Sequence, residues 1–270
     1  MADCMPKRII DECQKRGIAP MIGLDSCLKS LHHSYRCGQA FNGTSSVPIE
    51  VSIPVSSKMQ TKKTLTEFNG KRLLAKYGLS IPQGGLVSSI EGALRAAEKL
   101  SYPVTVKVSS EALVHKSDSG AIRVNIKDAE MLKLAVSELL QIGPSLLVEE
   151  MIEGAIAELI IGANCDPLFG KYLIIGSGGV LVELLSDSIP LLLPVERNSV
   201  LEALSELKLY PILEGYRGHS AGDIDAVIDA VMSAVDLINS NEVIEFDINP
   251  LLVLPQGKGA IAVDALVKLN

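Results

Sequence analysis

The C-terminal stretch VIEFDINPLLVLPQGKGAIAVDALV, residues 243–267, constrains the fold most strongly. It contains two alternating runs of apolar residues joined by a short loop at 256–259, and alternation at period two is typical of β-strands. Because the connection is so short, the two strands are expected to pair antiparallel. Reflecting the pair about Gly257 brings Asp264 beside Asn249, to within one or two residues.

The first strand of this pair separates apolar from polar side chains. Glu245, Asp247 and Asn249 share one face at period two, and a row of oxygen-bearing side chains suits a hard cation such as Mg²⁺. Asp264 lies within an apolar run, where an unpaired carboxylate would be costly and metal coordination would offset that cost. The alternative interpretation is a solvated polar face with no ligand.

Helical and extended patterns are mixed along the main part of the chain without strict βαβ alternation, which favours an α+β fold with largely antiparallel sheets. Periodicity predicts helices over residues 65–77, 89–100, 129–141, 197–207 and 223–239. It predicts strands over residues 84–87, 103–108, 121–126, 145–151, 156–163, 171–175 and 180–185. The predicted helix starts are capping boxes at Thr64 with Glu67 and at Ser88 with Glu91, and a cap at Asp128.

The N-terminal part is predicted to be organised separately. Residues 7–41 show a helix, a short strand at IAPMIG and a second helix, a βα fragment too small to bury its own sheet face. Residues 42–63 are rich in Ser, Thr and Pro and are interpreted as a linker. The main domain is then expected over 64–270, with a first subdomain at 64–142 and a second at 143–270.

Composition excludes several classes of function. A net charge of −7 argues against nonspecific nucleic-acid binding, and aromatic residues at 4 % argue against base stacking. No apolar run approaches the roughly 18 residues that span a bilayer, and the N-terminus lacks a signal-peptide pattern, so a cytoplasmic protein is expected. Five cysteines without a CxxC pair predict free thiols rather than a zinc site.

Three further segments carry candidate chemistry. Lys107 lies inside the alternating run PVTVKV, so it either reaches solvent at a sheet edge or faces a polar cleft, where it could hold nucleotide phosphates. The turn GSGG at 176–179 could place backbone N–H groups against phosphate, although ordinary hairpins use the same residues. In VHKSDSG, His115 is either a loop residue without a role or a group that carries chemistry.

Several motifs together resemble one family. LTEFNGKRLLAKYGLSIP, YPVTVKVSSEALVHKSDSGAIRV, LLVEEMIEGAIAELIIG, GSGGVLVELLSD, EFDINPLLV and AVDA occur in the order found in the ATP-grasp, or β, part of ADP-forming acyl-CoA synthetases, of which ADP-forming acetate–CoA ligase is the type. The resemblance covers about residues 64–268 and implies an ATP-grasp fold, with nucleotide between two α+β subdomains. Residues 7–41 are similar to the last βα unit of the flavodoxin-like ligase domain that precedes ATP-grasp in fused members.

The resemblance also implies an activity. The family interconverts acyl-CoA, ADP and phosphate with the free acid, CoA and ATP, through acyl phosphate and phosphohistidine. This implies Mg²⁺ as cofactor and ATP or ADP as substrate. It further implies an α partner, subunit or domain, that carries the CoA-binding domain and the primary phosphohistidine and binds the acid and CoA. A hetero- or homo-oligomer is therefore expected.

The same resemblance assigns roles to individual residues. Those expected at the nucleotide are Lys107, Glu149, Glu150, Met151, Glu158, Gly176, Gly178 and Gly179. Those expected at the metal are Asp247, Asn249 and Asp264, with Glu158 in support. Those expected in phosphoryl transfer are His115, which would relay the group to ADP, Asp118 and Arg217.

The sequence departs from the family at two positions, and two other functions compete. Ala121 stands where a glycine is usual, and Leu191 stands near the place of an arginine. The first rival is a catalytically degenerate ATP-grasp module that binds nucleotide for regulation or structure, as in fused protein acetyltransferases. The second is an ATP-grasp ligase that joins a carboxylate to an amine; HKSD argues against it, because such enzymes need no histidine relay.

Overall fold

The computed structural model describes residues 5–21, 23–42, 63–110, 120–179, 187–218, 220–240 and 242–270. His115, Asp118 and the strand predicted over 180–185 lie outside these residues. The chain divides into two compact units, Met1–Glu50 and Val51–Asn270, and each is described by itself.

The N-terminal unit contains two helices, α1 (Lys7–Lys15) and α2 (Leu24–Asn42). Both agree with the helical patterns, but the strand predicted at IAPMIG is wrong for its described residues, 18–21 and 23, which carry no strand. A lone strand has no partner here to complete its backbone hydrogen bonds. Helix α1 buries none of its residues, so this small unit has little core of its own.

The second unit contains two sheets in which every strand pair is antiparallel. The larger sheet has seven strands in the order β1 (Lys63–Thr64), β11 (Ala265–Leu269), β9 (Val243–Val253), β6 (Ala157–Asp166), β7 (Gly170–Ser177) and β8 (Ser188–Leu192), with β10 (Ala260–Ala262) paired to β9. The smaller sheet has the order β2 (Gly84–Val87), β5 (Leu146–Glu150), β3 (Val104–Val108) and β4 (Ile122–Ile126). The predicted α+β class with antiparallel sheets is confirmed.

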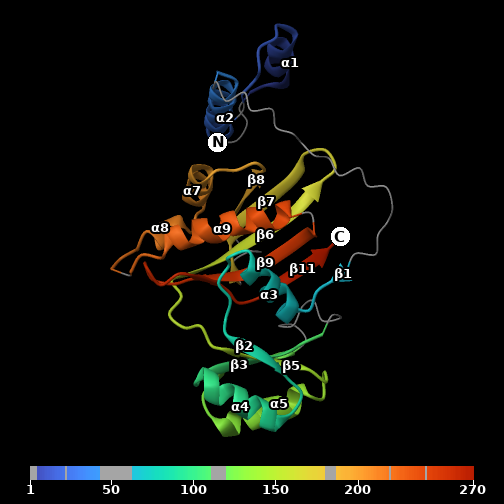
Figure 1. Ribbon diagram of the computed structural model, residues 1–270. Coiled ribbons are helices and arrows are strands. Elements are labelled where there is room, and N and C mark those ends of the chain that lie inside the picture. Colours follow the sequence, from blue (N-terminus) through green and yellow to red (C-terminus); the bar gives the residue numbers. More distant parts are fainter. Residues whose placement is uncertain are drawn as a thin grey trace. The chain divides into compact units, whose positions relative to one another are not determined.

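Each sheet has helices on one face (Figure 1). The larger sheet packs with α3 (Glu67–Lys76), α7 (Arg197–Glu206), α8 (Tyr210–Leu213) and α9 (Ile224–Asn239), and the smaller with α4 (Ile90–Leu100) and α5 (Ala129–Leu139). The predicted apolar stripe of α9 packs into the core of the larger sheet. None of the described helices is long and apolar enough to cross a membrane.

Of the three predicted helix caps, one is confirmed and two lie at neighbouring residues instead. Asp128 caps α5 as predicted, accepting a hydrogen bond from the Met131 N–H at 2.8 Å. The capping boxes at Thr64 and Ser88 are wrong by two residues and one residue, because the caps are Thr66 and Ser89. Thr64 pairs with Lys268 of β11, which keeps it extended and places the first helical residue later.

The predicted register of the C-terminal strands is confirmed. The Asn249 N–H donates to the Asp264 carbonyl at 3.3 Å, and the Val263 N–H donates to the Pro250 carbonyl at 3.2 Å. Asp264 therefore lies opposite Asn249. The N-terminal part of β9 pairs with β11 and its C-terminal part pairs with β10. The single predicted strand is therefore two short strands with Val263 and Asp264 between them.

Candidate functional site

Lys107 lies at the centre of the candidate site. Strand β3 runs between β5 and β4, so the edge-strand interpretation of this lysine is wrong. Val104, Val106 and Val108 pack into the core against α4 and α5, and alternation turns Thr105 and Lys107 to the opposite face. The Lys107 side chain is only 7% exposed. It therefore ends in a polar interior rather than in solvent.

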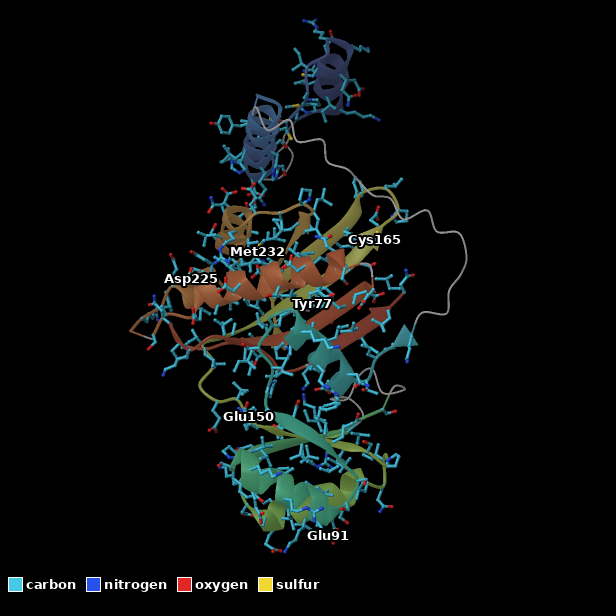
Figure 2. All side chains as sticks on the ribbon, viewed as in Figure 1. Tyr77, Glu91, Glu150, Cys165, Asp225 and Met232 are labelled. Carbon is cyan, nitrogen blue, oxygen red and sulfur yellow. The ribbon has the colours of Figure 1, made fainter. Side chains whose placement is uncertain are left out.

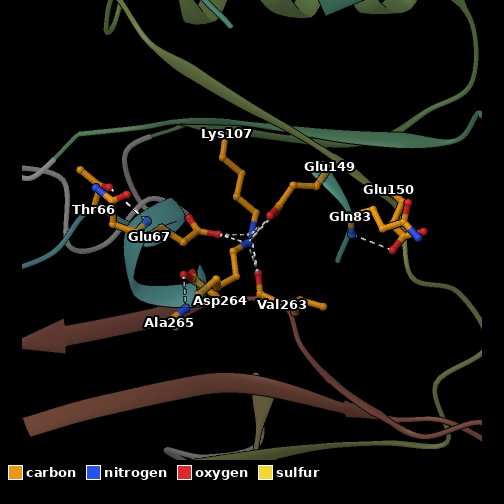
Figure 3. Close-up of polar contacts among 11 residues, drawn as sticks. Thr66, Glu67, Gln83, Lys107, Glu149, Glu150, Val263, Asp264 and Ala265 are labelled. Atoms are coloured by element: carbon orange, nitrogen blue, oxygen red, sulfur yellow. Dashed lines mark hydrogen bonds and ion pairs between the residues drawn. The ribbon is translucent and has the colours of Figure 1, made fainter. Parts of the chain in front are cut away.

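Lys107 belongs to a buried cluster of four charges, shown in Figure 3. Its Nζ lies 2.7 Å from Glu67 Oε1 and 3.6 Å from Glu149 Oε2. A second ammonium group, that of Lys71, lies 2.7 Å from Glu67 Oε1 and 2.6 Å from Glu149 Oε2. The Lys71 side chain is 1% exposed. Two cations and two anions thus offset one another out of contact with water.

The cluster joins the smaller sheet to the strands of the larger one. Lys107 Nζ donates to the Val263 carbonyl at 2.7 Å, and Lys71 Nζ donates to the same oxygen at 3.2 Å. Val263 directly precedes Asp264 in the connection between β10 and β11. Both ammonium groups are therefore held next to the carboxylate predicted to bind metal.

The pKa values of Lys107 and Glu149 depend on burial and on the opposite charges beside them. Burial alone would lower the pKa of Lys107, but the carboxylates of Glu67, Asp264 and Glu149 outweigh it, and the pKa lies above its ordinary value. Burial raises the pKa of Glu149, and the ammonium groups of Lys71 and Lys107 oppose that rise. No buried side-chain polar atom among the described residues lacks a hydrogen-bond partner. The cluster is therefore fully paired, and removing one member would leave a buried charge unbalanced.

Glu67 and Lys71 are functional candidates that the sequence patterns did not identify. In TEFNGK they stand four residues apart on a helix, a spacing usual for exposed ion pairs on helix surfaces. Only the tertiary structure reveals that both side chains are buried, because α3 packs on the larger sheet while Lys71 reaches Glu149 of the smaller sheet and the Val263 carbonyl of the β10–β11 connection. The available signal was that Lys71 falls on the buried face of α3 with Leu74.

The predicted metal residues lie on β9 and on the connection between β10 and β11. Asp247 and Asn249 lie on the solvent-facing side of β9, with Asp264 opposite Asn249. Partial burial raises the pKa of Asp247, and the carboxylates of Asp264 and Glu245 raise it further. The described residues contain no cluster of three or more His, Cys, Asp or Glu side chains suited to a metal. Two carboxylates and an amide nevertheless fit Mg²⁺, which keeps several waters and is commonly held by one or two carboxylates and phosphates.

A β-bulge shapes β9 at this place. The pairing of β9 with β6 shifts between Leu159 and Ile161, and the buried residues of β9 change phase from Phe246 and Ile248 to Leu251 and Val253. Such bulges re-aim side chains and are common beside active sites. Here the bulge falls at 249–250, so it separates the polar row that ends at Asn249 from the apolar end of the strand.

The turn predicted at GSGG, residues 176–179, is wrong for its first half, because Gly176 and Ser177 are the last residues of β7 and pair with β6. Gly178 and Gly179 follow that strand. The Gly178 N–H donates to the Glu158 carbonyl at 2.7 Å, so Glu158 and the glycines, predicted separately, are neighbours. A Cβ at Gly178 would lie 2.8 Å from the Leu159 carbonyl oxygen, which leaves no room for a side chain. The end of β7 is also fixed by Asp187, which accepts hydrogen bonds from Ser177 Oγ at 2.5 Å and the Lys208 N–H at 2.9 Å.

The close approach at Gly178 makes a direct prediction. Gly178→Ala is expected to destabilise the chain by about 1–3 kcal/mol, because the added methyl group must displace the backbone of β6. Gly85→Ala is the matched control, since a Cβ there meets no atom within 4 Å. Urea denaturation followed by circular dichroism measures both variants, and equal midpoints for the two would contradict the packing described.

The segment predicted to meet a nucleotide base already uses several backbone groups. The Glu150 N–H donates to the Gln83 carbonyl at 3.0 Å, and the Met151 N–H donates to the Pro103 carbonyl at 3.2 Å. Glu150, at the end of β5 (Figure 2), also accepts the Gln83 N–H at 2.8 Å through its carboxylate. The side chain of Glu149 turns the other way, into the charge cluster.

Arg217, which was predicted to act in phosphoryl transfer, lies on the surface and not in the lysine cluster. It is exposed, adopts a positive φ of 50°, and lies over the Tyr216 ring at 5.1 Å. Among the described residues it forms no ion pair and no contact with the lysine cluster. Of the departures noted in the sequence, Ala121 is fully buried beside β3, where its carbonyl accepts the Val108 N–H at 2.9 Å.

Comparison with known proteins extends this picture. Residues 56–269 match the family described as the ATP-grasp domain. The β subunit of acetate–CoA ligase [ADP-forming] II from Pyrococcus furiosus is 33% identical over 221 residues, covering 78% of this chain and 94% of that protein. The 4-hydroxybutyrate–CoA ligase [ADP-forming] of Nitrosopumilus maritimus is 32% identical, but the match spans 78% of this chain and only 32% of that longer protein.

A solved structure shows a similar fold. It is dinucleotide-forming acetyl-coenzyme A synthetase 1 of Ca. Korarchaeum cryptofilum, in complex with coenzyme A and Mg-AMPPCP. Its phosphohistidine segment is described as pointing towards the nucleotide binding site. The TM-score is 0.67 at 32% identity, covering 77% of this chain and 93% of that chain.

Proposed function

Because this chain belongs to the ATP-grasp domain family, among the β subunits of ADP-forming acetate–CoA ligases, we propose that it is the nucleotide-binding part of an ADP-forming acyl-CoA synthetase. It transfers a phosphoryl group between phosphohistidine and ADP or ATP, within the reaction of acyl-CoA, ADP and phosphate to acid, CoA and ATP. The observation that carries the proposal is the pair of buried ammonium groups, Lys71 and Lys107, bonded to one carbonyl beside Asp264.

The two lysines hold the nucleotide phosphates. Without nucleotide, their charges are neutralised by Glu67 and Glu149. Phosphate oxygens compete with these carboxylates for the same N–H donors, and charge-assisted hydrogen bonds to phosphate are strong in a site that excludes water. Binding is therefore an exchange of partners at Lys71 and Lys107, and the segment from Glu149 to Met151 meets the base through its carbonyl oxygens.

Asn249 and Asp264 hold Mg²⁺, with Asp247 and Glu158 beside them. When bound, Mg²⁺ would neutralise negative charge on the phosphates. Asp247 benefits from a nearby cation because its carboxylate is crowded by Asp264 and Glu245. The GSGG turn offers backbone N–H groups to the terminal phosphate, and Glu158 fixes the turn through its carbonyl.

His115, which lies between β3 and β4 in the sequence, carries the phosphoryl group. A neutral imidazole nitrogen attacks phosphorus, a P–N bond forms as the bond to the donor breaks, and the group then passes to the β-phosphate oxygen of ADP as that P–N bond breaks. Asp118 orients the second ring nitrogen. The solved structure whose phosphohistidine segment is described as pointing towards the nucleotide binding site supports phosphoryl transfer between a phosphohistidine and the nucleotide.

The proposed enzyme acts with an α partner. The relatives of matching length are β subunits of two-part ligases, and the fused relatives are about three times longer than the matched region. The partner supplies the CoA-binding domain and the primary phosphohistidine, and it binds the acid and CoA. Arg217, exposed on the surface, is available to meet phosphate when the two parts assemble.

Labelling tests this proposal. The chain is incubated with γ-labelled ATP and Mg²⁺, with and without its α partner, and acid-labile label is mapped by peptide. Label on His115 is expected with the partner present, and His115→Ala is expected to remove it from that peptide. His33→Ala is the matched control, because His33 lies on the exposed surface of α2. In this variant the label on the His115 peptide should be unchanged. Nucleotide binding without label on His115 would contradict the relay and leave a nucleotide-binding module without transfer.

A further inference from the structure

The smaller sheet ends in a strand with an open edge. β2 pairs with β5, and no other described strand pairs with β2. The Glu150 N–H donates to the Gln83 carbonyl, which fixes the phase of the ladder. Alternation then turns the N–H and C=O groups of Gly84 and Leu86 away from β5. No hydrogen bond joins these outward groups to any other described residue.

A cavity of about 990 Å³ runs along this edge. All four residues of β2 line it, α3 forms one wall with Phe68 and Arg72, and α4 forms the other with Arg95 and Lys99. The Leu86 side chain is 45% exposed. The cavity thus offers a row of backbone donors and acceptors and an apolar contact between two helices.

The charge of this cavity is opposite to that of the whole chain. Arg72, Arg95 and Lys99 are exposed and form no ion pair with a described residue, while the chain carries a net charge of −7. The remaining charged groups in the wall, Lys71 and Glu149, offset each other. Three positive charges therefore face the open edge without a neutralising partner.

We propose that this edge binds an acidic segment of a second polypeptide in extended conformation, which adds to the sheet as a strand beside β2. Strand addition obtains affinity from main-chain hydrogen bonds and specificity from the flanking side chains. Here Gly84 and Leu86 supply the main-chain groups, and the basic residues of α3 and α4 select carboxylates.

Two features distinguish this edge from a merely protected one. Proteins usually guard an edge with charges on the strand itself, but β2 reads GGLV and carries none. The glycine at 84 also has a local reason, since a Cβ there would lie 2.6 Å from Glu149 Cγ. A second copy of this chain is a poor occupant, because pairing two such edges would oppose two sets of the same positive charges.

The test uses a labelled eight-residue peptide that alternates glutamate and valine, titrated into the full chain by fluorescence anisotropy. We expect saturable binding, with slowed hydrogen exchange at the amides of Gly84 and Leu86. Arg95→Glu combined with Lys99→Glu should weaken binding at least tenfold, and a peptide alternating lysine and valine should not bind. Lys76→Glu, an exposed lysine on α3 outside the cavity, is the matched control and should bind normally.

Leu86→Pro separates strand addition from simple charge attraction. Proline is tolerated where the N–H points away from the ladder, so this variant should keep the far-ultraviolet circular dichroism of the wild type and lose peptide binding. Normal binding by a folded Leu86→Pro chain, an unchanged affinity after reversal of the Arg95 and Lys99 charges, or no binding by the wild type would each overturn the proposal. Displacement of the peptide by phosphate or ADP alone would show a small-anion site instead, and dimers that form through this edge would show self-association.

Discussion

Lys107→Met is expected to weaken Mg·ADP binding at least about 100-fold and to lower the free energy of unfolding by about 3–5 kcal/mol. The side chain is buried, and its ammonium group is bonded to Glu67 and to the Val263 carbonyl. Methionine fills most of the volume but leaves Lys71 alone to balance Glu67 and Glu149. Calorimetry measures the binding, and urea denaturation without ligand measures the stability.

Lys268→Met is the control for this substitution. Lys268 pairs with Glu245 at 2.6 Å, but both side chains are about 30% exposed, and exposed pairs contribute about 0–1 kcal/mol. We therefore expect normal Mg·ADP binding and a stability within about 1 kcal/mol of the wild type. If Lys107→Met bound nucleotide as tightly as Lys268→Met, Lys107 would have no role at the phosphates.

Glu67→Gln is expected to lower the free energy of unfolding without weakening the binding of Mg·ADP. Without nucleotide, the variant leaves two buried ammonium groups facing a single carboxylate, so its free energy of unfolding should fall by about 3–5 kcal/mol. Phosphate oxygens would restore the missing negative charge. The affinity for Mg·ADP should therefore equal or exceed that of the wild type, and the stabilisation on saturation with ligand should be larger than in the wild type.

A thermal-shift series with increasing Mg·ADP measures this difference. Glu130→Gln is the matched control, because Glu130 forms an exposed pair with Lys133 and its loss should change neither quantity. A Glu67→Gln chain that is folded but binds Mg·ADP at least tenfold more weakly would show that Glu67 contributes to the nucleotide site directly. The partner-exchange account of the lysines would then be wrong.

The strand face proposed to bind metal could be predicted from the sequence, because its residues are placed by local geometry. A short loop at 256–259 sets the register of β9 and β10, so counting residues places Asp264 opposite Asn249. Alternation alone assigns Asp247 and Asn249 to the polar side of their strand. The confirmed cap at Asp128 is likewise a local feature, whose side chain bonds an N–H three residues away.

The lysine cluster could be predicted only in part from the sequence. Lys107 stands out within an apolar run, but Lys71 resembles an ordinary surface residue until the fold brings its side chain to Glu149 of the smaller sheet. The interpretation of Glu149 was incomplete for the same reason, because the partner of its carboxylate is 78 residues distant in the chain. Contacts of that separation are fixed by tertiary packing, which neither periodicity nor capping chemistry specifies.

Every proposed step depends on binding of a magnesium nucleotide at the Lys71–Lys107 cluster. Calorimetric titration of ADP into the wild type, once with Mg²⁺ and once with EDTA, measures that binding directly. We expect one saturable site per chain with Mg²⁺, weaker binding in EDTA, and loss of the site in Lys107→Met. Absence of binding to ADP and to ATP by the folded wild type in Mg²⁺ would contradict it.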